Sequence, residues 1–260
     1  MKNLRKYGNA PFNVAVIHGG PGAPGEMAPV ARELSSIWGV LEPLQTATTI
    51  EGQIEELKNV LIKNGNLPVL LIGWSWGAWL SFIFAAQHSE FVKKLILIGS
   101  GPYEEKYSLN INKTRLNRLS KEEIAQALSL IETLSNPAIK DKNTPMALFG
   151  KLISKADSYD PLPHKSEILE CQYDKYQNVW EQARKLRSSG KLLEFGKNIQ
   201  CPVVALHGDY DPHPYEGIKR PLSCILKDFR FILLDNCGHQ PWIERSAKSR
   251  FYNVLKSEIE

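Results

Sequence analysis

Short apolar runs alternate with amphipathic segments along most of this chain of 260 residues. Some of these runs are continuously apolar, as at residues 69–72, Val-Leu-Leu-Ile. Such runs are typical of central strands in a parallel sheet, because those strands are buried on both faces. The pattern predicts strands at residues 12–17, 38–41, 69–72, 95–98, 203–206 and 229–234.

Helical periodicity marks much of the sequence between these runs. Residues 50–61 and 247–259 each place apolar side chains three or four positions apart, on one face of a helix. Thr48 and Glu51 have the spacing of a capping box at the start of the first of these helices. The alternation of strands and helices predicts an α/β fold that is doubly wound around a mainly parallel sheet.

The alternation is interrupted between residues 102 and 200, where no segment has a convincing strand pattern. This stretch is charged and helix-prone, and Ser120 and Glu123 have the spacing of a second capping box. We therefore expect a core made of residues 1–101 and 201–260, with a helical insertion at residues 102–200 before the strand that leads to Asp211.

Composition narrows the class of protein. Hydrophobic residues make up 43% and charged residues 23% of the chain, which is typical of a globular protein. The net charge of +4 is dispersed and forms no basic stripe, so we expect no nucleic-acid partner. No apolar run reaches the roughly 18 residues that a membrane span requires, so we expect no membrane partner. The four cysteines show no disulfide or metal-binding pattern, which predicts reduced thiols and a cytoplasmic location.

The strongest chemical signal is the sequence Gly-Trp-Ser-Trp-Gly at residues 73–77, between a predicted strand and an apolar, helix-prone segment. A G-x-S-x-G sequence in this context is typical of a nucleophile elbow, a tight turn that exposes the serine hydroxyl at the carboxyl end of the sheet. We therefore predict that Ser75 is a nucleophile. The alternative is a buried serine at an ordinary strand-to-helix turn.

A glycine-rich loop, His-Gly-Gly-Pro-Gly at residues 18–22, follows the first predicted strand. Acyl transfer needs backbone N–H groups directed at the developing oxyanion. We predict that Gly20 and Trp76 supply these two N–H groups. Trp79 suits the protein core as well as it suits a pocket. The candidates for the lining of a substrate pocket are His18, Trp74 and Trp79.

The same loop permits a second interpretation. Residues 20–25 match G-x-G-x-x-G after a strand, and Glu42 lies at the end of the next predicted strand, as in a dinucleotide-binding site. Pro21 and Pro24, however, lack the N–H groups that would donate to a pyrophosphate. Dinucleotide binding is therefore the weaker alternative.

A serine hydroxyl needs a base that removes its proton, and a carboxylate must hold that base in one tautomer. His239 follows the last predicted strand, and Asp211 follows the strand before it. Ser75, Asp211 and His239 thus have the chain order of a hydrolase built on a doubly wound sheet. Asp209 is an alternative acid, but Asp211 lies further past its strand and has more loop with which to reach His239.

A metal site is another alternative for this region, where two histidines alternate with two aspartates: His207, Asp209, Asp211 and His213. Alternate side chains of an extended strand would share one face. Pro212 and Pro214 argue against a regular strand at this place, so we predict no metal site.

In this order, the motifs resemble those of the α/β-hydrolase superfamily over nearly the whole chain. The loop at residues 18–22 and the elbow at residues 73–77 resemble the proline iminopeptidase-like branch and its esterase relatives. Residues 208–211 fit the pattern G-x-x-D, and residues 238–241 fit G-H-x-P. The resemblance implies that residues 102–200 form a helical cap over an α/β-hydrolase core.

Two features depart from that branch. Its usual Asp-x-Arg-Gly segment is replaced by Glu-Pro-Leu-Gln-Thr at residues 42–46. The chain also begins almost directly with the strand that leads to the glycine-rich loop, so we expect the usual N-terminal antiparallel pair of strands to be absent. Both departures weaken any inference about an iminopeptidase substrate.

Together these residues predict a serine hydrolase that cleaves a small ester, amide or short peptide through an acyl-enzyme on Ser75, without a cofactor. We rank ester hydrolysis above prolyl aminopeptidase activity. A free amine needs an acidic partner, and nothing in the sequence places a cap acid over Ser75. The alternative from another class is a non-catalytic protein of the same fold that binds a small ligand.

Overall fold

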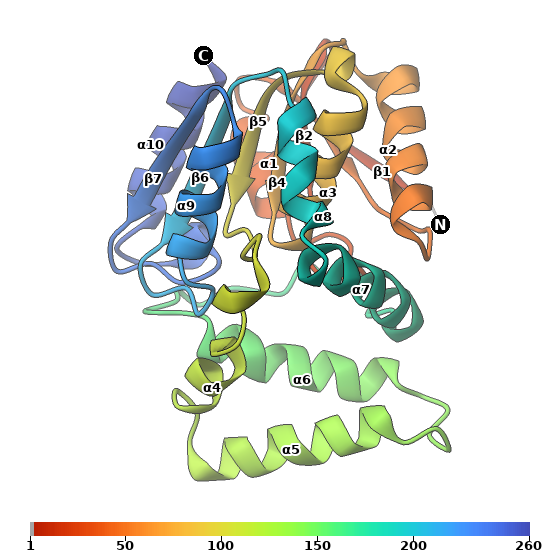
Figure 1. Ribbon diagram of the computed structural model, residues 1–260, viewed down its shortest axis with the longest axis vertical. Coiled ribbons are helices and arrows are strands. Elements are labelled where there is room, and N and C mark those ends of the chain that lie inside the picture. Colours follow the sequence, from red (N-terminus) through yellow and green to blue (C-terminus); the bar gives the residue numbers. More distant parts are fainter. Residues whose placement is uncertain (1–2) are drawn as a thin grey trace.

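A single mixed sheet forms the centre of the structure, a computed structural model that describes residues 3–260 (Figure 1). Within these residues the strand order is β1-β3-β2-β4-β5-β6-β7, with β1 antiparallel to β3 and every other pair parallel. All six predicted strands are present, as β2 to β7. The strands are β1 (Leu4–Tyr7), β2 (Phe12–Ile17), β3 (Gly39–Pro43), β4 (Val69–Trp74), β5 (Val92–Ile98), β6 (Val203–Gly208) and β7 (Phe229–Leu234).

Helices cover both faces of the sheet, which is why its central strands are apolar along their whole length. In β4, Leu70 and Ile72 pack into one hydrophobic cluster with α1 and α10, whereas Val69 and Leu71 pack into another with α2, α3 and α9. The predicted doubly wound architecture is thus confirmed. These helices are α1 (Ala28–Leu34), α2 (Ile50–Asn64), α3 (Trp76–Gln87), α9 (Glu216–Ile225) and α10 (Lys248–Ile259).

The chain between β5 and β6 is helical, as predicted. Helices α4, α5 and α6 lie beyond the carboxyl ends of the strands, whereas α7 and α8 lie closer to the sheet (Figure 1). Val179 and Ala183 of α7 join the core cluster that contains α2 and α3. We call this stretch the cap. Its helices are α4 (Ile111–Leu116), α5 (Lys121–Ser135), α6 (Asn143–Ala156), α7 (Tyr173–Ser188) and α8 (Lys191–Glu194).

The two expected capping boxes have different outcomes. At the start of α5, the Glu123 N–H donates to Ser120 Oγ at 3.3 Å and the Ser120 N–H donates to Glu123 Oε2 at 3.0 Å, which confirms that box. The box expected from Thr48 is wrong by one residue. Helix α2 begins after Thr49, whose Oγ1 accepts a hydrogen bond from the Gly52 N–H at 3.0 Å. Because Thr48 and Thr49 are adjacent, the sequence pattern does not show which of them caps the helix.

The expected absence of antiparallel structure at the N-terminus is also wrong. Strand β1 pairs antiparallel with β3, from Leu4 opposite Pro43 to Tyr7 opposite Val40. The strand is short and half charged, so it lacks an apolar pattern. Its partners lie more than thirty residues away: the Tyr7 hydroxyl donates to Glu42 Oε2 at 2.8 Å, and Arg5 lies 3.5 Å from the same oxygen.

In the part of the chain that the structure describes, no helix combines the length and the apolar character needed to cross a membrane.

Candidate active site

Ser75 occupies the turn between β4 and α3. Its backbone has φ 54° and ψ −116°, a region that non-glycine residues rarely adopt. A Cβ on Gly73 would collide with the Gly77 carbonyl, and a Cβ on Gly77 would collide with the carbonyls of Ile17 and His18. The two glycines therefore let β2, β4 and α3 approach closely enough to hold the serine in its strained position.

His239 and Asp211 come together from the loops that follow β7 and β6. The His239 Nδ1 atom lies 2.7 Å from Asp211 Oδ2, and both residues are buried. Burial alone would raise the pKa of Asp211, but the neighbouring histidines outweigh it and hold that pKa well below its usual range. Burial alone would lower the pKa of His239, but the Asp211 carboxylate outweighs it and raises that pKa. The pair therefore favours charge on both partners.

Trp74 joins the histidine loop to the serine turn. Its indole N–H donates to the His239 carbonyl at 2.8 Å, and the centroids of the two rings lie 5.2 Å apart. Because Trp74 directly precedes Ser75, His239 is packed beside the elbow. Within residues 3–260 the Ser75 hydroxyl makes no direct hydrogen bond to the imidazole; such bonds are often long in a protein without substrate and tighten when substrate binds.

A second histidine binds the same carboxylate. The Asp211 Oδ1 atom accepts hydrogen bonds from the His213 backbone N–H at 2.9 Å and lies 2.7 Å from His213 Nδ1. The His213 and His239 ring centroids are 4.8 Å apart. Burial lowers the pKa of His213 to about 4 despite Asp211, so this imidazole is neutral near pH 7. Both carboxylate oxygens of Asp211 are thereby fixed in place.

Asp209, the alternative acid, makes its contacts away from the His239 imidazole. Its Oδ1 atom accepts from the Cys237 backbone N–H at 3.1 Å, and its own N–H donates to the Leu234 carbonyl at 3.0 Å. The side chain is therefore occupied in joining the loops after β6 and β7. The structure brings Asp211, and not Asp209, to the imidazole of His239.

The two predicted oxyanion donors lie at the ends of adjacent elements. Gly20, with φ 38°, follows β2, and Trp76 is the first residue of α3. Among residues 3–260 neither backbone N–H donates to another group of the chain. The Trp76 N–H also lies at the positive end of the helix dipole. The Trp76 indole is held separately, by donation to Gln53 Oε1 at 3.0 Å.

The predicted pocket residues are packed inside the protein. His18 is fully buried; the Gln45 N–H donates to its Nε2 at 3.3 Å, so its Nδ1–H donates to the Gly19 carbonyl at 2.7 Å. Burial lowers the pKa of His18 to about 4, which keeps it neutral. Trp79 is 1% exposed and belongs to the core cluster, where it stacks on Trp180 with the ring centroids 5.8 Å apart.

Sequence reasoning did not single out Glu26, which follows the glycine-rich loop. Its Oε2 atom lies 3.8 Å from the position that a Cβ on Gly20 would occupy. Burial raises the pKa of Glu26 to about 8, against a smaller lowering by His239. A signal was available, because Glu26 is the one charged residue in the otherwise glycine-, proline- and alanine-rich stretch 19–31.

The dinucleotide alternative has little support from the loop geometry. The cap segment covers residues 20–25: the Gln172 N–H donates to the Gly22 carbonyl at 2.8 Å, and the Leu169 N–H donates to the Pro24 carbonyl at 2.9 Å. Glu42, the expected ribose partner, is buried and bonded to Tyr7. The loop therefore offers no open cradle for a pyrophosphate.

The four side chains of the metal alternative do not converge, because Asp209 is bonded to the Cys237 backbone. Among residues 3–260, the group whose ligand atoms lie within 4.8 Å of one another is Asp211, His213 and His239. These three side chains already bond to one another through the Asp211 carboxylate.

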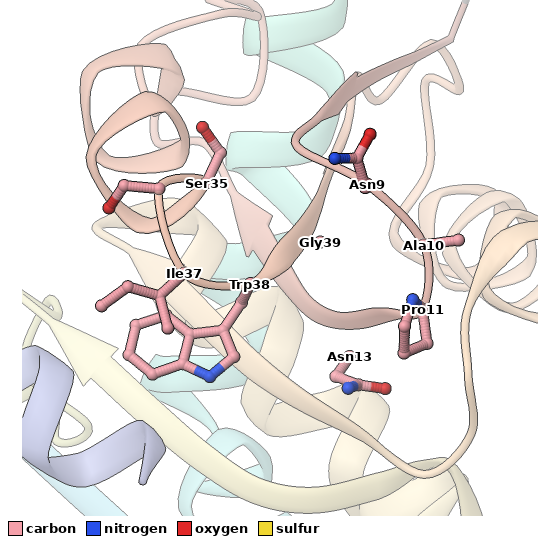
Figure 2. A pocket seen from close by; sticks show the side chains of 9 residues that line it. Asn9, Ala10, Pro11, Asn13, Ser35, Ile37, Trp38 and Gly39 are labelled. Atoms are coloured by element: carbon pink, nitrogen blue, oxygen red, sulfur yellow. The ribbon is translucent and has the colours of Figure 1, made fainter.

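A hollow of about 360 Å³ lies far from these residues (Figure 2). It is found at the amino ends of β2 and β3, whereas Ser75 and His239 lie at the carboxyl ends of the strands. Its lining includes no titratable side chain, so it offers no acid, base or nucleophile. The residues that line it are Asn9, Ala10, Pro11, Asn13, Ser35, Ser36, Ile37, Trp38 and Gly39.

The mostly parallel sheet, with helices on both of its faces, is that of an α/β hydrolase. The sequence profile described as alpha/beta hydrolase fold matches residues 35–246, and the chain belongs to this family.

Individual relatives are distant. The chain is 24% identical over 216 residues to the pimeloyl-[acyl-carrier protein] methyl ester esterase of Chromobacterium violaceum, covering 79% of this chain and 76% of the relative. It is 22% identical over 279 residues to the proline iminopeptidase of Saccharolobus solfataricus, covering 95% and 84%. The crystal structure of VinJ superimposes with a TM-score of 0.68 at 18% identity, covering 98% of this chain and 93% of that one.

Proposed function

We propose that this protein is a serine hydrolase that cleaves a small ester, amide or short peptide through an acyl-enzyme on Ser75. The observation that carries the proposal is the meeting, at one edge of the sheet, of a strained serine turn and a buried Asp211–His239 pair. Strain at a non-glycine residue persists only where the surrounding structure enforces it, and such strain is concentrated at functional sites.

The proposed reaction proceeds in two halves. Ser75 Oγ attacks the substrate carbonyl carbon while His239 Nε2 takes the hydroxyl proton, with Asp211 holding Nδ1–H and stabilising the imidazolium. The Gly20 and Trp76 N–H groups hold the negative oxygen. The C–O or C–N bond then breaks, and His239 returns the proton to the leaving group. In the second half water attacks the acyl-enzyme by the same route and releases Ser75.

The cap acids support ester hydrolysis as the first candidate. The Asp157 carboxylate is bonded twice to Arg115, each bond 2.7 Å long. Four other cap acids form ion pairs as well, which would have to break before these acids bound a substrate amine; among residues 3–260, Glu170 and Asp174 form none. These pairs are Glu104 with Lys106, Glu105 with Arg187, Asp160 with Arg245 and Glu167 with Arg32.

Prolyl aminopeptidase activity is the second candidate, favoured by the His-Gly-Gly-Pro-Gly loop and by the proline iminopeptidase relative. We place the chain in or near the proline iminopeptidase-like branch on these grounds. Because the chain lacks the Asp-x-Arg-Gly segment, we rank prolyl aminopeptidase activity below ester hydrolysis.

A substrate panel tests the proposal. The kcat/KM is measured for p-nitrophenyl esters of two to eight carbons and for proline p-nitroanilide with a free or acetylated amine. We expect short esters to be cleaved and Ser75→Ala to reduce kcat by at least about 10³-fold. Ser100→Ala, at the carboxyl end of the neighbouring strand, is the matched control and should retain activity. Strong preference for the free proline amine would instead favour the peptidase, and tight ligand binding without turnover would favour a binding protein.

A further inference from the structure

The Glu26 carboxyl lies against the oxyanion loop of the proposed function. It belongs to the connection between β2 and α1, and its Oε2 atom lies 3.8 Å from the Cβ position of Gly20. Two other groups interact electrostatically with this carboxyl. His239 acts on Glu26 from the loop after β7, and the Cys171 thiol of the cap has its pKa raised by burial and then by Glu26. Glu26 thus lies close enough to the His239 loop and to the cap for its charge to act on both.

This carboxyl has no partner in the described chain. Within residues 3–260 it accepts no hydrogen bond and forms no ion pair. The other acids that the fold buries are bonded: Glu42 to the Tyr7 hydroxyl, Asp157 to Arg115, and Glu258 to Lys94. Glu26 is half-buried. A partly buried carboxyl without a donor is costly to ionise, and burial accordingly raises its pKa to about 8.

The basic side chains near this loop do not neutralise the charge of an ionised Glu26. His18, at the end of β2, is neutral because burial lowers its pKa to about 4. Arg5 approaches the neighbouring Gly25, but its guanidinium pairs with Glu42. Ionised Glu26 would therefore leave a negative charge near Gly20, where the proposed reaction builds a second one.

We propose that Glu26 determines substrate specificity: its carboxylate opposes the oxyanion of an uncharged acyl group and favours an acyl group that brings a positive charge. Two negative charges at short range repel each other, and the more so where protein partly excludes water. A protonated amine on the acyl group would supply the ion pair that the chain lacks. This inference rests on the proposed function, because it takes Gly20 as an oxyanion donor.

The test uses two esters that differ only in an amine, methyl propionate and alanine methyl ester. The kcat/KM is measured for both at pH 8, where Glu26 is about half ionised, with the wild-type protein, Glu26→Gln and Glu33→Gln. Glutamine removes the charge and retains the shape, so the alanyl-to-propionyl ratio should fall by at least about tenfold in Glu26→Gln. Glu33 lies on α1 and pairs with Lys256, so Glu33→Gln should leave the ratio unchanged. An unchanged ratio in Glu26→Gln would overturn the proposal.

A pH profile gives a second readout. For the uncharged ester, kcat/KM should decline above about pH 8 in the wild-type protein, because Glu26 ionises there, and the decline should be absent in Glu26→Gln. If Glu26→Gln does not fold, the wild-type protein alone still tests the proposal. Its labelling by an uncharged fluorophosphonate should slow above about pH 8, and a rate that stays level to pH 9.5 would overturn the proposal. Failure of Ser75 to be labelled at any pH would contradict the proposed function instead.

Discussion

Asp211 is the residue on which the candidate site is centred, since it binds two imidazoles at once. One oxygen holds His239 and the other holds His213, each at 2.7 Å from an Nδ1 atom. The backbone N–H of His213 adds a third bond. A carboxylate fixed at both oxygens cannot rotate away from His239, so the imidazole it orients is held in one tautomer and one plane.

Replacement of this carboxylate separates its role from that of its neighbour. Asp211→Asn should preserve the fold but reduce kcat by about 10³–10⁴-fold, because an amide no longer orients and stabilises the imidazolium. Asp209→Asn is the matched control, since the Asp209 side chain bonds to the Cys237 backbone. This substitution should reduce kcat by less than about tenfold. Steady-state kinetics and circular dichroism provide the readout, and the reverse ranking would show that Asp209 is the working acid.

Among the elements, the end of α6 and the loop after β7 form one unit. The His239 N–H donates to the Asp157 carbonyl at 2.8 Å. Glu244, which is fully buried, accepts hydrogen bonds from the backbone N–H groups of Tyr159, Asp160 and Gly238 at 2.8 to 3.0 Å. The cap is therefore anchored to the segment that carries the histidine.

Loss of that anchor should affect both stability and rate. Glu244→Ala leaves three backbone N–H groups without an acceptor and should lower the free energy of unfolding by about 3 kcal/mol or more. It should also reduce kcat, because the His239 loop is released. Glu132→Ala, on the exposed face of α5, is the comparison and should change the unfolding free energy by less than about 0.5 kcal/mol. Urea unfolding measures both, and equal stabilities for the two variants would contradict the anchoring role.

The elements differ in how far the sequence predicts them. Strands β2 to β7 and the serine turn follow from local patterns, and the meeting of Asp211 and His239 follows from the rule that parallel strands end at one edge. Strand β1 could not be predicted, because its stability comes from distant partners such as Glu42. A role for Glu26 could not be predicted either, because the sequence does not show that its carboxyl lacks a hydrogen-bond donor in the folded chain.

Over the whole molecule, buried neutral histidines couple folding to pH. Burial lowers the pKa of His18 and of His213 to about 4 in the folded protein, whereas an unfolded histidine titrates near about 6.5. Between these values each of these two histidines binds more protons in the unfolded chain than in the folded one, so each lowers the stability as the pH falls. The raised pKa of His239 acts in the opposite sense, because it stabilises the fold below about 6.5.

Burial lowers the pKa of His207 too, so three buried histidines destabilise the fold in acid, whereas the raised pKa values of His239 and Glu26 act in the opposite sense. The share of one histidine is isolated by comparing variants in urea denaturation at fixed ionic strength from pH 7 to pH 4.5. His213→Asn keeps a polar side chain beside Asp211 but removes the titration, so its stability should fall less steeply over the same range. The same pH dependence of stability in the wild-type protein and in His213→Asn would contradict this picture.

Covalent trapping shows whether Ser75 is an activated nucleophile. The protein is incubated with an uncharged fluorophosphonate at pH 7.5, and the modified peptide is identified by mass spectrometry in the wild-type protein, Ser75→Ala and His239→Ala. We expect a single adduct on Ser75, no adduct in Ser75→Ala, and much slower labelling in His239→Ala, because the serine then lacks its base. Labelling that persists in Ser75→Ala, or that proceeds at the wild-type rate without His239, would contradict this expectation.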